Sequence, residues 1–216
     1  MDIAIIGAGN VGGALARAFT QAGHSVVVTS RDPEDGRALA AATGARLVSS
    51  NREAAEAGEM VVLAVPFTSA PEIAVEIAEA VTGKTVIDVT NRMTFGANGP
   101  DIDTTTSNSE ELAALLPAAH IVKAFNTLFA SRQADPTLEG VRLDGYIAAD
   151  DAEAKAAVAA LVESVGLRPV DVGPLARARQ LEALAFLNIS LNVAHQGTWQ
   201  SGWKLVGAPE TLPVAA

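Results

Sequence analysis

Short apolar runs alternate with stretches of helical periodicity along most of this chain. The apolar runs lie at residues 2–6, 25–29, 60–65, 85–89 and 120–124. Helical patterns fall between and after them, at 10–22, 34–43, 51–58, 70–81 and 109–116. The runs are continuously apolar rather than alternating, which is typical of strands covered on both faces. The order predicts an α/β fold with a Rossmann-type, doubly wound parallel sheet.

The remaining pattern extends this plan toward the C-terminus. Further strands are expected at 46–49, 144–149 and 168–172, and a helix at 152–165 that Asp150 or Asp151 caps. A long helix from 175 to about 196, followed by a shorter helical piece, ends the chain. We therefore expect a Rossmann domain at 1–174, whose ligand the motifs below indicate. The segment 175–216 is expected to form a small helical extension that completes the cleft and provides a dimer interface.

One long stretch, residues 92–109, fits neither period and is predicted to be an irregular loop. A loop of that length inside a compact domain is more often functional than accidental. We expect it to lie near the chemistry.

The first apolar run leads into a glycine-rich turn. Gly7, Gly9 and Gly12 have G-x-G-x-x-G spacing, with Asn10 and Val11 between them. The pattern follows a strand and opens a helix, which is the context required for a dinucleotide-binding turn. The first glycine allows the tight turn, the second admits the pyrophosphate, and the third lets helix and strand pack closely. The alternative is a glycine turn that packs a strand on a helix without a ligand.

The residues after the second strand indicate which dinucleotide is bound. An Asp or Glu at this position usually holds the ribose hydroxyls of NAD, whereas here the segment reads Thr29-Ser30-Arg31-Asp32. Ser30 can donate to a phosphate, and Arg31 offers a fork of donors, which favours the 2′-phosphate of NADP. The alternative is that Asp32 binds the ribose of NAD. Arg37 could assist or could be simply exposed.

Composition excludes several classes of function. A formal net charge of −10 argues against a general nucleic-acid surface, which needs a basic face. The absence of cysteine excludes disulfides and thiolate metal sites, and it fits a reducing compartment. No apolar stretch reaches the roughly 18 residues of a membrane span, and no signal-like segment opens the chain. We expect a cytoplasmic protein without membrane or nucleic-acid partners.

Titratable candidates for catalysis are few. His24 is interpreted as structural, His120 as buried or capping, and His195 as a weak candidate for catalysis. Lys123 could be an acid or a surface charge at a strand end. No metal-ligand spacing and no nucleophile elbow occurs, so no catalytic residue and no metal site is assigned. Hydride transfer between two redox rings fits this absence, because it needs alignment more than proton chemistry.

Several motifs together carry a family resemblance. They are GAGNVG at 7–12, SRDP at 30–33, AVPF at 64–67, DVTN at 88–91, VKAFNTL at 122–128, ADDAEAK at 149–155 and DVGPLARARQLE at 171–182. With them, the chain resembles the coenzyme F420-dependent NADP oxidoreductase family over nearly its whole length. It resembles more distantly the oxidoreductase domain of the STEAP metalloreductases.

This resemblance implies a set of cofactor-binding residues. It assigns the 2′-phosphate of NADP(H) to Ser30 and Arg31. It assigns the nicotinamide to strand ends at Ala64, Val65, Pro66, Phe67, Val89 and Asn91. It assigns the border of the deazaflavin to Ala124, Phe125, Asn126 and Thr127. The family often carries histidine where this chain has Phe125-Asn126, and the asparagine version is closer to the metalloreductases.

The resemblance also implies an activity and an assembly. Members transfer a hydride between NADP(H) and coenzyme F420 and are commonly homodimers, so we expect an NADPH-dependent homodimeric reductase. FMN or FAD could replace F420 as the second redox group, and a ferric reductase is a related alternative. A reductase of small carbonyls or imines would need a proton donor that the sequence does not show. A regulatory protein that binds NADP(H) without turnover is the alternative of a different class.

Overall fold

One central sheet organises the molecule in the computed structural model, which describes residues 1–97 and 99–207. Its eight strands in this described part are β1 (Asp2–Ile6), β2 (Ser25–Thr29), β3 (Arg46–Leu47), β4 (Met60–Leu63), β5 (Thr85–Asp88), β8 (His120–Lys123), β11 (Asp144–Ala149) and β12 (Arg168–Asp171). They lie in the order β12-β11-β8-β5-β4-β1-β2-β3. The order reverses between β1 and β4, and a doubly wound sheet binds its ligands at such a switch point.

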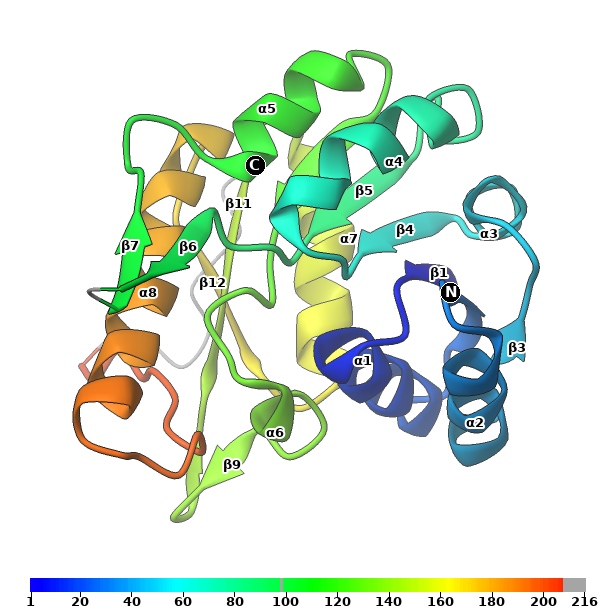
Figure 1. Ribbon diagram of the computed structural model, residues 1–216. Helices are drawn as coiled ribbons and strands as arrows, with labels where there is room; N and C mark the ends of the chain where they lie inside the picture. The colour runs from blue at the N-terminus through cyan, green and yellow to red at the C-terminus, as the bar shows by residue number, and fades with distance from the viewer. Residues whose placement is uncertain (98, 208–216) are drawn as a thin grey trace.

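Helices cover both faces of the sheet (Figure 1). One face carries α1 (Asn10–Gln21), α2 (Pro33–Thr43) and α7 (Ala152–Ser164), and the other carries α3 (Asn51–Ala57), α4 (Ala70–Ile77) and α5 (Asn108–Leu115). Alternate residues of an apolar strand point to opposite faces of the sheet and so belong to the two different core layers. In β1, Ile3 and Ile5 join the core on the α1 side, whereas Ala4 and Ile6 join the other. The Rossmann-type fold predicted from the sequence is therefore confirmed.

The direction of one strand pair differs from the expected parallel sheet. Six neighbouring strands of the sheet, β3, β2, β1, β4, β5 and β8, are parallel. By contrast, β11 runs antiparallel to β8, and β12 follows the direction of β11. A parallel return needs a crossover of about a dozen residues or more, usually a helix. Here the connection holds only α6 (Ala130–Gln133) and a hairpin of β9 (Thr137–Leu138) with β10 (Val141–Arg142). Because α6 has only four residues, no long helix carries the chain back across the sheet, and β11 runs opposite to β8.

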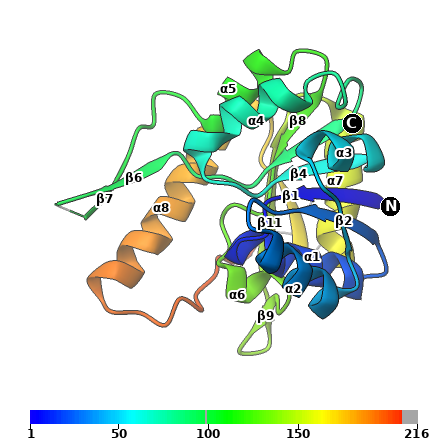
Figure 2. The same ribbon diagram turned by 45° about the vertical axis from the view of Figure 1, so that its right-hand side comes forward.

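The stretch 92–109, predicted to be irregular, contains a second hairpin. β6 (Met93–Gly96) pairs antiparallel with β7 (Gly99–Ile102), with Met93 opposite Ile102. Two strands of four residues, rich in glycine and proline at their ends, are too short to show a period of two. The hairpin projects from the body of the molecule beside α8 (Ala178–Ala194), as Figure 2 shows.

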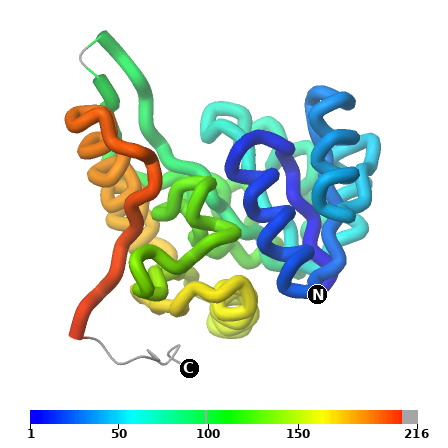
Figure 3. The backbone as a smooth tube through the Cα atoms, turned by 90° about the horizontal axis from the view of Figure 1, so that it is seen from below, coloured from blue at the N-terminus to red at the C-terminus, as the bar shows by residue number. Residues whose placement is uncertain are grey.

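The C-terminal part leaves the sheet and then returns to it. A short η2 turn (Leu175–Arg177) leads into α8, but the shorter helical piece expected afterwards is absent from residues 197–207. These residues instead run back past α8 (Figure 3), and the carbonyl of Trp203 accepts a hydrogen bond from the Asp144 amide at 3.1 Å. Residues 208–216 of the expected segment lie outside the described residues. In residues 1–97 and 99–207, no helix has both the length and the apolar content to span a membrane.

Candidate functional site: a nucleotide turn and an apolar cleft

The glycine turn between β1 and α1 is packed too tightly for larger residues. Gly7 has φ +111°, and a Cβ there would lie 2.3 Å from the carbonyl oxygen of Ala64. A Cβ on Gly12 would lie 1.9 Å from the carbonyl oxygen of Gly7. A Cβ on Gly9 would meet no atom within 4 Å, so this glycine faces open space. Two glycines are thus required by packing, while Gly9 lies where the motif expects the pyrophosphate.

Helix α1 begins in that open space with its backbone donors uncapped. Gly9 is the N-cap residue, and no side chain of the described residues accepts a hydrogen bond from the first turn. By contrast, Asp32 caps α2 and Ser107 caps α5. An uncapped N-terminus offers free N–H groups and the positive end of the helix dipole to an anion. The geometry therefore fits a phosphate at the turn.

The end of β2 separates Arg31 from its neighbour Asp32. Oδ1 of Asp32 accepts hydrogen bonds from the backbone amides of Glu34 at 2.8 Å and Asp35 at 3.4 Å. Because this carboxylate is engaged in the helix cap, it is less suited to hold the ribose of NAD. Arg31 is exposed, and within residues 1–97 and 99–207 no hydrogen bond or ion pair engages its guanidinium. The arrangement favours the interpretation of Ser30 and Arg31 as donors to a 2′-phosphate.

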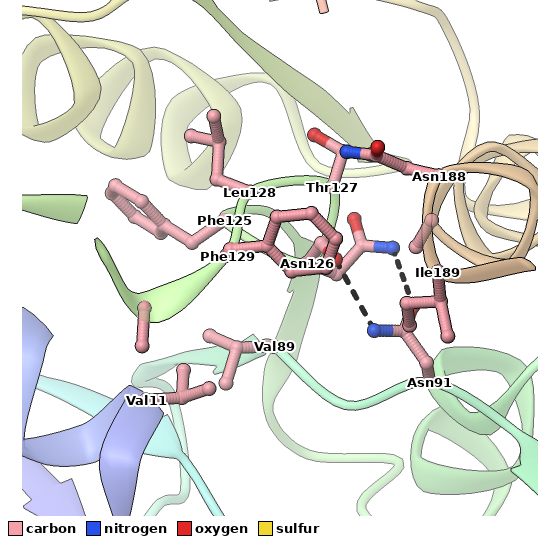
Figure 4. A pocket seen from close by; sticks show the side chains of 12 residues that line it. Val11, Val89, Asn91, Phe125, Asn126, Thr127, Leu128, Phe129, Asn188 and Ile189 are labelled. Atoms are coloured by element: carbon pink, nitrogen blue, oxygen red, sulfur yellow. Dashed lines mark hydrogen bonds between the residues drawn. The ribbon is translucent and has the colours of Figure 1, made fainter. Parts of the chain in front are cut away.

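A cleft opens at the carboxyl ends of β5 and β8, between the sheet and α8 (Figure 4). It holds about 470 Å³ of empty space, continuous with solvent. Its lining residues are Val11, Val89, Asn91, Phe125, Asn126, Thr127, Leu128, Phe129, Ala130, Ala185, Asn188 and Ile189. As far as the described residues show, the lining is apolar apart from three amides and one hydroxyl, and it includes no titratable side chain.

Two asparagines join the strand ends across the floor of this cleft. The Asn91 side chain donates to the Asn126 carbonyl at 3.2 Å, and the Asn126 side chain donates to Oδ1 of Asn91 at 2.9 Å. Figure 4 shows the pair facing Asn188 and Ile189 of α8. Oδ1 of Asn126 is buried, and no group in the described residues donates to it. The paired side chains of Asn91 and Asn126 thus fix the floor of the cleft.

The backbone turns sharply before Asn126. Phe125 has φ +60°, a left-handed conformation that is uncommon for a bulky residue. Its ring packs edge-on against Phe19 with centroids 5.6 Å apart, and Nε2 of Gln133 donates to its carbonyl at 2.8 Å. Packing and a side-chain hydrogen bond therefore hold a strained residue beside the cleft, where such strain tends to concentrate.

The structure brings together some of the expected site residues and separates others. Val11, Val89, Asn91, Phe125, Asn126 and Thr127 line one cleft. Ala64 and Val65 pack against the glycine turn, Pro66 is exposed, and Phe67 begins the short η1 helix (Phe67–Ser69). Ala124 is buried in the core and does not line the cleft. The role of each in cofactor binding stays a prediction.

The three histidines lie away from the cleft. Nε2 of His24 lies 2.8 Å from the Ser164 hydroxyl, and burial and the nearby amino terminus lower the pKa of its imidazole. His120, expected to be buried or capping, is exposed and pairs with Asp151, the residue that caps α7. His195 is exposed just after α8 and lines a separate hollow with Trp203. The described residues contain no group of His, Asp or Glu that could hold a metal ion.

Lys123 is neither a cleft acid nor a surface charge, and both expectations for it were wrong. It is fully buried, and its ammonium donates to Oδ2 of Asp88 at 2.9 Å, Oε1 of Glu182 at 2.7 Å and the Thr90 carbonyl at 2.6 Å. An ammonium has three N–H donors, and all three are engaged. Asp88 and Glu182 were not among the predicted site residues.

The sequence did contain a signal for this cluster. Asp88 and Lys123 are the last residues of two apolar strands, carry opposite charges, and are register partners between β5 and β8. Glu182 interrupts the apolar pattern of α8. Burial would raise the pKa of the Asp88 carboxyl, but the charge of Lys123 and hydrogen bonds from Ser109, Lys123 and the Thr90 amide outweigh it. The pKa of Asp88 is therefore lowered.

The sheet order, the uncapped glycine turn and the cleft at the strand ends are those of a Rossmann-type, dinucleotide-binding protein, and the comparisons identify its class as an NADP oxidoreductase. The family model described as "NADP oxidoreductase coenzyme F420-dependent" matches residues 2–92. The F420-dependent NADP reductase of Methanothermobacter marburgensis is 31% identical, over 97% of this chain and 100% of that protein. The chain thus belongs to the family of F420-dependent NADP oxidoreductases.

Two further proteins are similar to most of this chain, one by structure and one by sequence. A crystal structure described as a candidate F420-dependent NADP reductase, from Arthrobacter sp. FB24, has a TM-score of 0.83 and 29% identity. The match covers 90% of this chain and 95% of that one. Metalloreductase STEAP3 of Rattus norvegicus is 34% identical over 84% of this chain, which spans only 36% of that protein's length.

Proposed function

We propose that this protein transfers a hydride directly between NADP(H) and coenzyme F420. One observation carries the proposal: among residues 1–97 and 99–207, no titratable side chain lines the cleft. The reaction breaks the C4–H bond of the dihydronicotinamide and forms a C–H bond at C5 of the deazaflavin, while a ring nitrogen takes a proton from water. Such a step needs two stacked rings and an enclosing surface rather than a general acid.

The proposed nucleotide site uses both ends of the first βαβ unit. The open space at Gly9 and the uncapped start of α1 fit the pyrophosphate. Ser30 and Arg31 lie at the end of β2, where they can engage the extra phosphate of NADP. The nicotinamide would then lie over the ends of β4 and β5, with Val11 and Val89 beneath it.

The proposed deazaflavin site lies between the asparagine floor and α8. Asn91, Asn126 and Thr127 supply amide and hydroxyl groups at this floor, and such groups can hydrogen-bond to the ring N–H and carbonyls of a deazaflavin. Ala185, Asn188 and Ile189 of α8 form the facing wall. The names of the full-length relatives support F420 as the occupant of this space.

Rapid mixing with alternative acceptors tests this assignment. Protein loaded with NADPH is mixed with F420, FMN, FAD or a ferric chelate, and the absorbance of each acceptor is followed through a single turnover. We expect F420 to be reduced and the other acceptors to react much more slowly. No reduction of F420, with brisk reduction of a flavin or ferric chelate, would overturn the assignment.

A flavin or ferric reductase is the second candidate function. It is favoured by the similarity to STEAP3 over most of the chain and by the asparagine at position 126. The acceptor series above separates it from the first, because both share NADPH and differ only in the second redox group.

We also propose that α8 forms a dimer interface. One face of it exposes Leu187 and Leu191, which are 48% and 45% accessible, and Val193 on another side is 46% accessible. Contiguous exposed apolar surface commonly marks a protein–protein contact. A second copy is the occupant that the family resemblance supports. A monomer mass by light scattering across the micromolar range would refute the dimer.

A further inference from the structure

Three buried charges meet where β5, β8 and α8 approach one another. Asp88 and Lys123 are fully buried, and Glu182 is 1% exposed. The ammonium of Lys123 bridges the carboxylates of Asp88 and Glu182 at 2.9 and 2.7 Å. We call these three residues the charge triad. It is the direct connection between the sheet and the helix that forms the far wall of the cleft.

The charge triad also holds the backbone that follows β5. Oδ1 of Asp88 accepts from the Thr90 amide at 2.9 Å, and Lys123 donates to the Thr90 carbonyl at 2.6 Å. Oε2 of Glu182 accepts from the Arg92 amide at 3.0 Å. The residue between them is Asn91, which bonds to Asn126 in the floor of the cleft. These three contacts lie on either side of Asn91, which faces the ligand space (Figure 4). Oε1 of Glu182 also accepts from the Asn108 amide of α5 at 3.0 Å.

Stability does not by itself explain the triad. Two carboxylates and one ammonium leave a net negative charge in the interior if all are ionised, and desolvation of buried ions offsets much of their attraction. Apolar residues of similar volume often serve folding as well or better. Charged groups add direction, because each of their hydrogen bonds fixes one atom of the backbone.

We propose that Asp88, Lys123 and Glu182 are positioning residues, which fix residues 90–92 against α8 and so set the width of the cleft. They act through Asn91 and touch no ligand themselves. The kinetic consequence rests on the proposed hydride transfer, whereas the structural consequence does not. Loss of the triad is expected to slow the alignment of the two rings without weakening the binding of NADPH, whose phosphates lie at the other end of the cleft.

The variant Glu182→Gln tests this role with little change in shape. It keeps the Asp88–Lys123 pair, removes one buried charge and weakens the acceptor for the Arg92 amide. The matched control is Glu110→Gln. Glu110 also ties α8 to α5, through two hydrogen bonds from Arg179 at 2.8 and 2.7 Å, but it contacts no atom of residues 90–92. If Glu182→Gln fails to fold, Glu182→Asp is measured in the same way.

Hydrogen exchange provides the readout that needs no substrate. In the full chain without ligand, Glu182→Gln should speed exchange of the Arg92 amide by roughly tenfold or more, the effect of losing a charge-assisted bond. Glu110→Gln should leave it unchanged. Equal exchange in the two variants would overturn the proposal.

Single-turnover kinetics provides the second readout. With F420, or with whichever acceptor the wild type reduces, Glu182→Gln should lower the rate at saturation by roughly tenfold. The dissociation constant for NADPH should stay within about twofold of the wild type, since each tenfold change needs about 1.4 kcal/mol of lost contact. Equal losses in Glu182→Gln and Glu110→Gln, or a loss only in NADPH affinity, would contradict a positioning role. Failure of F420 in the wild type would instead count against the proposed function alone.

Discussion

The surface of the cleft and the layer directly behind it differ sharply in charge. In the part of the chain that the structure describes, the surface is apolar with a few amides and includes no ionisable side chain. The layer behind it buries Asp88, Lys123 and Glu182, all engaged with one another or with backbone. The buried charged residues thus fix the position of the cleft walls, while the apolar walls determine the shape of the ligand space. That division suits a reaction in which the cofactors carry the chemistry and the protein supplies alignment.

Removal of the central charge behind the cleft should have the largest effect. In Lys123→Met, two carboxylates remain buried without their shared cation. Breaking a buried ion pair in this way costs about 3–5 kcal/mol of unfolding free energy. Urea unfolding monitored by circular dichroism at neutral pH measures it. A loss below about 1 kcal/mol, the value expected for an exposed pair, would show that the triad is not buried as described.

A change of shape on the surface of the cleft should act on rate rather than on stability. Ile189→Trp fills space between α8 and the floor, and should slow hydride transfer by about a hundredfold by preventing ring stacking. NADPH affinity should change little. Gln180→Trp, on an exposed position of the same helix, is the control. Similar rates in both variants, compared by single-turnover absorbance, would place the reaction elsewhere.

Arg31 is the charged residue predicted to contact the ligand, at the 2′-phosphate end of NADP(H). Arg31→Ala should weaken NADPH binding by roughly ten- to a hundredfold through the lost bond to the 2′-phosphate, and leave NADH binding unchanged. Arg46→Ala, an exposed arginine of β3 outside the candidate site, is the matched control. Calorimetry with both nucleotides gives the comparison, and equal losses for NADPH and NADH would contradict the assignment to NADP.

Lowering the pH should reduce the contribution of Asp88 to the free energy of unfolding. The folded pKa of Asp88 lies below its unfolded value of about 3.9. Its contribution to stability is therefore present above that value and is lost as pH falls through the lower, folded pKa. The stability difference between wild type and Asp88→Asn should shrink as pH falls from about 6 toward 3. A difference that grows on acidification, by urea unfolding, would reverse the sign.

Histidine replacements should have the smallest effect. His120→Gln and His195→Gln remove groups that lie outside the cleft, and the rate of hydride transfer should change by less than about twofold. A general acid typically contributes a hundredfold or more. A loss of that size in either variant would mean that a titratable group reaches the reacting rings.

Local patterns predicted most of the strands and helices, because buried strands and capped helices are decided by neighbouring residues. The antiparallel direction of β11 was not predictable in this way, since it depends on the lack of a long crossover helix between residues 124 and 143. The hairpin at β6 and β7 was missed because its strands are only four residues long.

The candidate site was predicted unevenly for a related reason. The glycine turn and Asn91 directly follow strands, so local sequence motifs are sufficient to identify them. The cleft wall formed by Asn188 and Ile189 comes from a helix almost a hundred residues later, and no local pattern links it to the strand ends. Asp88 and Lys123 could have been paired from their matching positions in adjacent strands, whereas the position of Glu182 needs the tertiary structure.

Direct transfer of the hydride is the central claim, and isotope labelling tests it most directly. NADPH carrying deuterium at both C4 positions is mixed with the protein and F420 in ordinary water, and the reduced deazaflavin is analysed by mass spectrometry. A cleft that aligns two rings without an ionisable intermediary predicts one deuterium retained in each reduced deazaflavin. Loss of the label to water would contradict the account.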